Sequence, residues 1–109
     1  MKRGDVITVA LQGDLGKPRP AVVVETDRLA PTNHVLVCPG TSYILHGVPN
    51  RRLLVLPSDK NGLREPTFFQ ADKVNPARRE VCGAVIGQLD EEAMEQIGMK
   101  LAVVLGLTE

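Results

Sequence analysis

Aromatic side chains are scarce in this sequence of 109 residues, which contains one tyrosine, two phenylalanines and no tryptophan. Many proteins that bind single-stranded nucleic acid stack successive bases on aromatic side chains. Grooves that bind proline-rich peptides are also lined with aromatic residues. The composition therefore argues against both kinds of binding module. Any contact with a nucleic acid is expected to depend on phosphates and hydrogen bonds.

Cysteine is also rare: the chain contains only Cys38 and Cys82, which lie far apart in apolar segments. The sequence therefore has no CxxC redox pair and no zinc-site spacing. It also lacks a GxxxxGK phosphate loop, a cluster of His and Cys residues, and a Ser/His/Asp pattern. These absences argue against an NTPase, a metalloenzyme and a serine hydrolase. We expect both cysteines to be buried thiols, and we expect neither a metal nor a cofactor.

Long apolar runs are absent as well. No segment approaches the roughly 20 apolar residues that a membrane-spanning helix requires. The N-terminal residues show no charged stretch followed by an apolar region and a cleavage site, as secretory leaders do. We therefore expect a cytoplasmic protein with no membrane association.

The formal net charge of the chain is zero, but the charges are unevenly placed. Residues 1–89 carry twelve Lys and Arg against eight Asp and Glu, and residues 90–109 carry one against five. A basic body favours contact with nucleic acid phosphates, and an acidic tail can lie away from that contact. An ordinary distribution of surface charges with no role in binding is compatible with the same counts. For Arg51 and Arg52 in particular, we expect positions on a solvated face.

Short apolar or alternating segments recur along the chain between residues that favour turns. This pattern predicts strands at residues 5–11, 21–25, 34–38, 53–56, 67–71 and 80–86. Loops rich in glycine, proline, asparagine or aspartate are expected at residues 12–18 and 57–66. Together with the helix described next, the pattern indicates one domain, residues 1–109, that is mainly β with a C-terminal α-helix. A small antiparallel barrel or sandwich fits this number of strands.

One helix is predicted, over residues 91–105. Asp90 is placed to cap its N-terminus, and Leu89 and Met94 occupy the positions of a hydrophobic staple. Apolar residues repeat with helical spacing after this start, so one face is expected to pack on the sheet or on a partner. Gly98 inside the helix costs about 1 kcal/mol relative to alanine, which indicates a close approach of another backbone.

Residues 16–24 join a short basic turn to an apolar strand. Arg19 stands between Pro18 and Pro20, and both prolines restrict the backbone around it. A guanidinium stays charged and offers a planar set of donors that matches a phosphate. An arginine held in this way is a candidate anion site. A solvated flank or half of a weak surface ion pair is also compatible with this position.

Several segments occur in an order that is typical of one protein family. They are Arg3-Gly4-Asp5, Arg19-Pro20-Ala21-Val22, Pro39-Gly40-Thr41-Ser42, Asn61-Gly62-Leu63, Asp72-Lys73-Val74 ahead of Arg78-Arg79, and Gly87-Gln88-Leu89-Asp90. In this order and spacing they resemble the MazF/PemK family of bacterial toxins over nearly the whole chain. The resemblance implies an SH3-like small β-barrel of the MazF/PemK/CcdB type and a homodimer. It also implies the toxin of a type II toxin–antitoxin system, which cleaves single-stranded RNA without a metal, blocks translation and is neutralised by a cognate antitoxin.

The resemblance also points to particular residues. The family's catalytic arginine and threonine carry over onto Arg19 and Thr41. Gly40 departs from the bulkier Leu or Ile that is usual before this threonine, so the pocket is expected to differ locally. The loop at residues 12–18 would cover the substrate groove, as it does in family members. Contacts to RNA are expected from Lys17, Ser42, Lys73, Arg78 and Arg79.

Cleavage of RNA without a metal ordinarily means that the ribose 2′-OH attacks the adjacent phosphate, so protons must move and negative charge must be stabilised. Arg19 is expected to stabilise this charge, with a role as general acid the lesser option. The Thr41 hydroxyl can donate to a phosphate oxygen, although a cross-strand hydrogen bond would explain a threonine in a strand equally well. His34 and His46 leave open an acid–base pair. Neither histidine matches a catalytic position of the family.

A related fold supports a different function. CcdB-like gyrase poisons bind a protein and do not cut RNA, and they resemble one another in a Trp-Gly-Ile ending. This chain ends in Gly106-Leu107-Thr108-Glu109 and has no tryptophan. An RNA-cleaving toxin is therefore the favoured function, and gyrase binding is the alternative.

Overall fold

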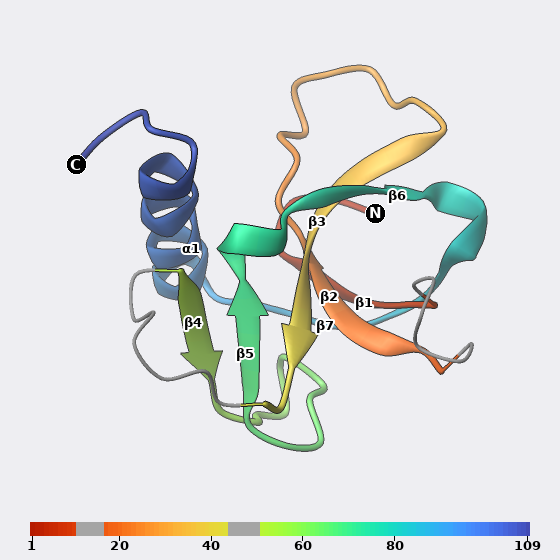
Figure 1. The fold of residues 1–109 in the computed structure, drawn as a ribbon. Coiled ribbons are helices and arrows are strands. Elements are labelled where there is room, and N and C mark those ends of the chain that lie inside the picture. The colour runs from red at the N-terminus through yellow and green to blue at the C-terminus, as the bar shows by residue number, and fades with distance from the viewer. Residues whose placement is uncertain (11–16, 44–50) are drawn as a thin grey trace.

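The computed structural model describes residues 1–10, 17–43 and 51–109. These ranges contain strands β1 (Asp5–Val9), β2 (Arg19–Val23), β3 (His34–Thr41), β4 (Arg52–Val55), β5 (Thr67–Gln70), β6 (Asn75–Arg78) and β7 (Cys82–Gln88) (Figure 1). They also contain the short 3₁₀ helices η1 (Ala71–Lys73) and η2 (Arg79–Val81) and the helix α1 (Glu91–Val104). The predicted fold, mainly β with a C-terminal helix, is confirmed.

All strand pairs are antiparallel, and the sheet runs in the order β4-β5-β3-β2-β1-β7. β3 organises this sheet because it pairs with three strands. Its residues from Val37 to Pro39 pair with β2, its last two residues pair with β5, and its first four residues pair with β6. The sheet bends along β3 and remains open, as a partly closed barrel. α1 packs against β4 and η1 (Figure 1).

Buried side chains form two clusters on the two faces of the bent sheet. Along β1, Val6 belongs to the cluster beneath α1, and Ile7 belongs to the cluster on the other face. This alternation follows from the two-residue period of a strand. Phe69 and Ile97 are both 0% exposed and join β5 to α1 in the first cluster. Burying a side chain of this size contributes about 1.5–3 kcal/mol, so these contacts hold the helix on the sheet.

The helix begins as predicted. The Asp90 carboxylate accepts a hydrogen bond of 2.8 Å from the backbone N–H of Ala93. The close approach expected at Gly98 is made by a side chain, because the nearest atom to a Cβ placed there is a guanidinium nitrogen of Arg3, at 3.5 Å. The expectation of a backbone at this place was therefore wrong. No helix among the described residues is both long and apolar enough to cross a membrane.

Most predicted strands are present with shifted ends, but one strand and the environment of one arginine were not predicted correctly. β6 was not predicted because Pro76 lies in it, and proline cannot donate to a strand ladder. Arg52 does not lie on a solvated face: its side chain is 9% exposed, and its Nε lies 3.6 Å from a carboxylate oxygen of Asp72. Residue 11, predicted to end the first strand, and most of the loop at residues 12–18 lie outside the described residues.

The two cysteines differ in burial. Cys38 is 0% exposed, as predicted, whereas Cys82 is only partly buried. Burial raises the pKa of the Cys38 thiol to about 12, an effect that the charge of Arg3 opposes. Burial also raises the pKa of Cys82, against the opposing charge of Arg79.

Because the thiolate is the reactive form, we expect iodoacetamide at pH 8 to alkylate Cys82 well before Cys38 in the native protein. Mass spectrometry of peptides from a time course measures both rates. In urea, where burial is lost, the two rates should become similar. Equal rates without urea would contradict the buried position of Cys38.

Candidate active site

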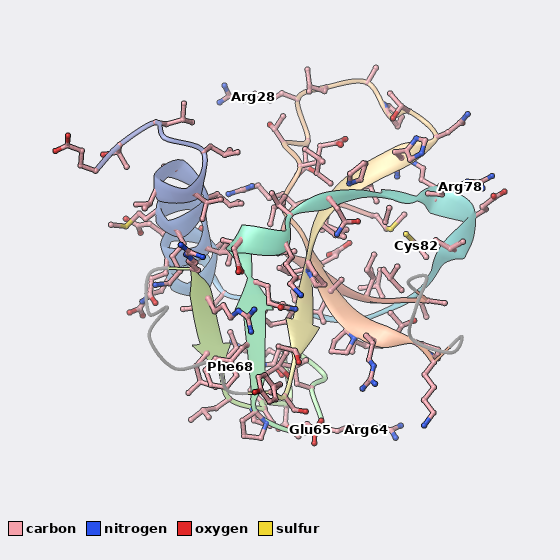
Figure 2. The ribbon with its side chains drawn as sticks, viewed as in Figure 1. Arg28, Arg64, Glu65, Phe68, Arg78 and Cys82 are labelled. Atoms are coloured by element: carbon pink, nitrogen blue, oxygen red, sulfur yellow. The ribbon has the colours of Figure 1, made fainter. Side chains whose placement is uncertain are left out.

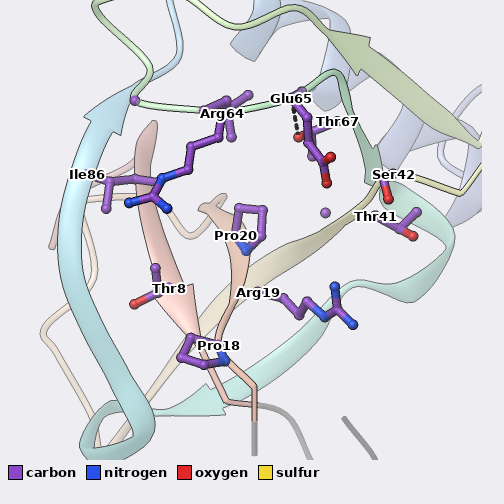
Figure 3. A pocket seen from close by; sticks show the side chains of 13 residues that line it. Thr8, Pro18, Arg19, Pro20, Thr41, Ser42, Arg64, Glu65, Thr67 and Ile86 are labelled. Carbon is purple, nitrogen blue, oxygen red and sulfur yellow. Dashed lines mark hydrogen bonds between the residues drawn. The ribbon is translucent and has the colours of Figure 1, made fainter.

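A cleft of about 550 Å³ opens at the end of β3 and is lined by residues from several strands (Figure 3). The described residues that line it are Thr8, Pro18, Arg19, Pro20, Gly40, Thr41, Ser42, Gly62, Leu63, Arg64, Glu65, Thr67 and Ile86. The structure therefore brings Arg19, Thr41 and Ser42 together in one cleft, as the resemblance implies. We refer to it as the Arg19 cleft.

Arg19 is the first residue of β2, where the sheet fixes its backbone opposite Val9. Its neighbour Pro20 pairs with Thr8 across the same ladder, so the stiff Pro-Arg-Pro step is tied to β1. The Arg19 side chain is exposed to solvent. Neither of the two ion pairs found among the described residues includes it. Its charge is therefore open to solvent and not engaged in either of these ion pairs.

Thr41 is the last residue of β3 and lies opposite Phe68 of β5. Its hydroxyl oxygen accepts a hydrogen bond of 3.1 Å from the backbone N–H of Tyr43. This contact fixes the hydroxyl oxygen but does not use the hydroxyl proton, which can still be donated to a ligand. Ser42 follows directly and is exposed.

Gly40 forms part of the wall between Arg19 and Thr41. A Cβ placed on Gly40 would lie 2.6 Å from the methyl carbon of Thr67 and 3.1 Å from the carbonyl oxygen of Pro20. The space that a Leu or Ile would occupy is therefore already filled by Thr67. Gly40 is itself buried, so Thr67 and Pro20 take the place of a bulky residue 40 in this wall of the cleft.

Two charged residues of the cleft, Arg64 and Glu65, were missed by the sequence analysis. Both follow the Asn61-Gly62-Leu63 turn in the loop before β5, and both are exposed. In Figure 3 the Glu65 carboxylate points toward the side of Arg19 and Thr41, and the Arg64 guanidinium points toward Ile86. The sequence signal that could have found them was the charged pair directly after a turn that matched the family.

The loop that carries this pair is held by hydrogen bonds from one buried side chain. Asn61 is 5% exposed. Its Oδ1 accepts hydrogen bonds of 3.0 Å from the backbone N–H groups of both Ser58 and Leu63, and its Nδ2 donates one of 2.9 Å to the carbonyl of Leu56. Buried polar groups that are satisfied in this way fix local geometry. Asn61 therefore determines the path of the chain into Arg64.

The same loop is also packed against the end of β7. The backbone N–H of Gln88 donates a hydrogen bond of 2.8 Å to the carbonyl of Lys60. Gly62 has a φ of +69°, and a Cβ placed on it would lie 2.1 Å from the carbonyl oxygen of Ile86. Only glycine combines this φ with so close an approach of two backbones. The cleft is therefore built on a fixed junction between the loop and a strand.

The other residues expected to contact RNA lie outside this cleft. Lys17 is exposed directly before Pro18, and Lys73 is exposed at the end of η1. Arg78 forms an ion pair with Glu80 and lies well apart from Arg64 (Figure 2).

Arg79 and His34 also lie away from the Arg19 cleft. Arg79 donates from its Nε to the carbonyl oxygen of Thr32 at 2.5 Å, which ties η2 to the turn before β3. His34, at the start of β3, pairs with Arg78 at the far end of that strand from Thr41. His46 lies outside the described residues. An acid–base pair of His34 with the cleft residues therefore has no support from the geometry.

Two of the three aromatic residues lie beside Thr41. Tyr43 is 68% exposed and follows Thr41 by two residues, and Phe68 is its cross-strand neighbour. Few aromatics are present, but two of them stand next to the predicted catalytic threonine. No group of three His, Cys, Asp or Glu side chains suited to a metal ion is found in residues 1–10, 17–43 and 51–109.

Comparisons with known proteins identify relatives that span nearly the whole chain. Residues 2–105 match the model of the family described as PemK-like, MazF-like toxin of type II toxin–antitoxin system. The chain is 33% identical to the "Probable endoribonuclease MazF" of Mycolicibacterium smegmatis, with 98% of each chain covered. Among solved structures, it resembles an endoribonuclease in complex with its cognate antitoxin from mycobacterial species (TM-score 0.81, 24% identity, 100% of this chain and 98% of that chain covered).

Two further solved structures have the same fold. One is the Mycobacterium tuberculosis toxin MazF-mt6, with a TM-score of 0.78, 20% identity, and 96% of this chain and 99% of that chain covered. The other is a MazE-MazF structure from Deinococcus radiodurans, with a TM-score of 0.72, 21% identity, and 99% and 97% covered. At these identities the similarity concerns the fold, and the match to the family model and to the M. smegmatis relative shows the family. The chain belongs to the PemK-like, MazF-like family of toxins of type II toxin–antitoxin systems.

Proposed function

We propose that the protein, a MazF-like endoribonuclease toxin, cuts single-stranded RNA in the Arg19 cleft without a metal ion. The observation that carries this proposal is the convergence of Arg19 and Thr41. The two residues are far apart in the sequence and come from different strands, yet they line one open cleft. They are also the residues that match the family's catalytic arginine and threonine.

The chemistry follows from the two side chains. When the ribose 2′-oxygen attacks the adjacent phosphate, the 2′-OH loses its proton, the bond from phosphorus to the 5′-oxygen breaks, and that oxygen takes up a proton. The products are a 2′,3′-cyclic phosphate and a 5′-OH, and negative charge grows on the phosphate oxygens during the step. The Arg19 guanidinium stabilises this charge with a planar pair of donors. The Thr41 hydroxyl donates a hydrogen bond to a second phosphate oxygen, while the backbone N–H of Tyr43 holds the hydroxyl oxygen in place.

The basic residues outside the cleft extend this contact along the RNA. Lys17 and Lys73 are exposed and are proposed to bind phosphates on either side of the cut. Ser42 contributes a hydroxyl beside Thr41. Arg78 and Arg79 are proposed as more distant phosphate contacts, made together with the contacts to Glu80 and Thr32 that hold them. Such contacts add affinity that falls as salt rises.

The toxin is proposed to act as a homodimer in the cytoplasm, where its mRNA substrate is translated. Apolar side chains on the edge strand β7 offer a surface for a second copy, since Val85 is 48% and Ile86 38% exposed. A cognate antitoxin is proposed to inhibit by laying an acidic segment across the basic cleft, ordering as it binds. Because the family match covers most of the chain, the gyrase poison is not favoured.

The test is cleavage of a long, mostly unstructured RNA in EDTA by the purified protein and by Thr41→Val. Valine keeps the branched shape of threonine but cannot donate a proton. We expect discrete cuts by the wild type with 5′-OH ends, and a rate at least about 10-fold lower for Thr41→Val, because one hydrogen bond to the transition state is lost. Mapping of the new 5′ ends and a time course measure both effects.

Thr41→Ser serves as the matched control because it restores the hydroxyl, and we expect it to recover most of the activity. Thermal unfolding of all three proteins shows whether they are equally folded. Cleavage that disappears in EDTA and returns with excess Mg²⁺ would contradict the metal-independent mechanism. A folded protein that cuts no RNA would overturn the proposed function.

A further inference from the structure

Glu65 is the only acidic side chain among the described residues that line the Arg19 cleft. The other charged residues there, Arg19 and Arg64, are suited to phosphates. A carboxylate repels a phosphate, so its place in an RNA-binding cleft calls for a different ligand. Neither of the two ion pairs between described residues includes Glu65, and in Figure 3 its carboxylate points away from the Arg64 guanidinium.

The backbone of Glu65 is fixed, although its side chain is exposed. The Thr67 hydroxyl donates a hydrogen bond of 2.9 Å to the carbonyl oxygen of Glu65. Four residues earlier, Asn61 holds the loop through its buried amide, and Gly62 locks the loop against the backbone of Ile86. Because the backbone of the loop is fixed, the Glu65 side chain can reach only a limited range of positions. Glu65 is therefore built into the cleft more firmly than a residue on an ordinary surface loop.

We propose that Glu65 is a specificity-determining residue, which accepts hydrogen bonds from the Watson–Crick edge of an unpaired guanine next to the cut phosphate. This inference rests on the proposed function, since it requires that RNA is cut in this cleft. An ionised carboxylate is an acceptor with two oxygens. In single-stranded RNA the Watson–Crick edges are free to be read in this way.

Guanine is the base that fits best, because its N1–H and its 2-amino group are two adjacent donors that match the two oxygens of a carboxylate. Adenine and cytosine offer one amino donor beside an acceptor, and the acceptor would face the carboxylate. Uracil offers a single N–H between two carbonyl oxygens. Arg19 and Thr41 then bind the phosphate while Glu65 selects the base beside it. The cleft thereby combines a general contact to the backbone with a specific contact to one base.

The experiment compares wild type, Glu65→Gln and the control Glu95→Gln, which makes the same chemical change on the exposed surface of α1. Cut sites are first mapped on a long unstructured RNA. We expect guanine at one position beside the wild-type cuts and a relaxed preference at that position for Glu65→Gln. Glutamine has the same length but presents one acceptor and one NH₂ group, so it cannot pair with both guanine donors.

The second step replaces that guanine by inosine, which lacks the 2-amino group, in a short single-stranded RNA. We expect the wild type and Glu95→Gln to cut the inosine substrate about 10-fold more slowly, the usual size of discrimination for a bidentate contact to a base. Glu65→Gln should cut both substrates at similar rates. Thermal unfolding of the three proteins verifies that they are equally folded.

An unchanged motif and an unchanged guanine-to-inosine ratio in Glu65→Gln would overturn the inference and leave the proposed function intact. An equal fall in rate at every site would also overturn it, because it indicates a role in proton transfer. Wild-type cuts with no guanine beside them would do the same. If the wild type cuts no RNA at all, the proposed function fails first and the inference fails with it.

Discussion

Replacing Arg19 by alanine is expected to lower the rate of RNA cleavage by roughly 10²–10³-fold, the loss that follows removal of one preorganised donor to a developing oxyanion. Arg19 lies at the start of β2 and is exposed in the cleft. Its removal leaves Thr41 as the remaining donor among the two residues that match the family. The rate of single cuts in a defined RNA substrate, measured with enzyme in excess, isolates the chemical step.

Two further variants separate the role of the Arg19 side chain from that of its charge. Arg19→Lys keeps the charge but loses the planar pair of donors, so we expect an intermediate rate. Arg28→Ala removes another exposed arginine, which lies away from Arg64 and the cleft (Figure 2), and it should leave the rate within a factor of about two, as for surface sites in general. If Arg28→Ala and Arg19→Ala lowered the rate equally, the effect would be one of net charge and Arg19 would lose its catalytic role.

The strands were predictable because their patterns are local. Alternating or apolar segments between turn residues are enough to place most of the sheet, and the cap at Asp90 is visible in the sequence itself. β6 was not predicted because residues 75–78 contain Pro76, and proline is unusual within a strand. In the structure Pro76 lies opposite Leu36 of β3. The burial of the Arg52 side chain was not predicted for another reason. Its burial depends on Asp72, which is distant in the sequence and comes near only in the folded chain.

The candidate site was predictable only in part, and mainly through the resemblance. The local pattern around Arg19 left a solvated position open, and Thr41 alone is compatible with an ordinary strand residue. Arg64 and Glu65 join the cleft because their loop packs on β7, through the hydrogen bond from Gln88 to Lys60. Contacts of this kind depend on how distant segments pack. The local sequence shows the turn and the charged pair after it, but not the strand on which the loop packs.

That packing makes Gly62 the position where we expect the largest loss of stability. Gly62→Ala places a Cβ at a φ of +69° and 2.1 Å from the backbone oxygen of Ile86. The backbone strain costs about 1–3 kcal/mol. Movement of the loop also breaks the hydrogen bond from Gln88 to Lys60, which adds about 1 kcal/mol. We expect the free energy of unfolding to fall by about 3 kcal/mol or more, measured by urea denaturation at one fixed protein concentration.

Gly106→Ala is the matched control for this prediction. Gly106 also has a positive φ, +74°, but a Cβ placed on it meets nothing within 4 Å. Its free energy of unfolding should therefore fall only by the cost of the left-handed backbone, about 1–2 kcal/mol. The difference between the two variants measures the close approach of the loop to β7, separately from the cost of a left-handed backbone. Equal losses would mean that the loop moves away from Ile86 freely. In that case Arg64 and Glu65 would not be held in the cleft by this junction, and their contribution to RNA binding would have to come from a mobile loop.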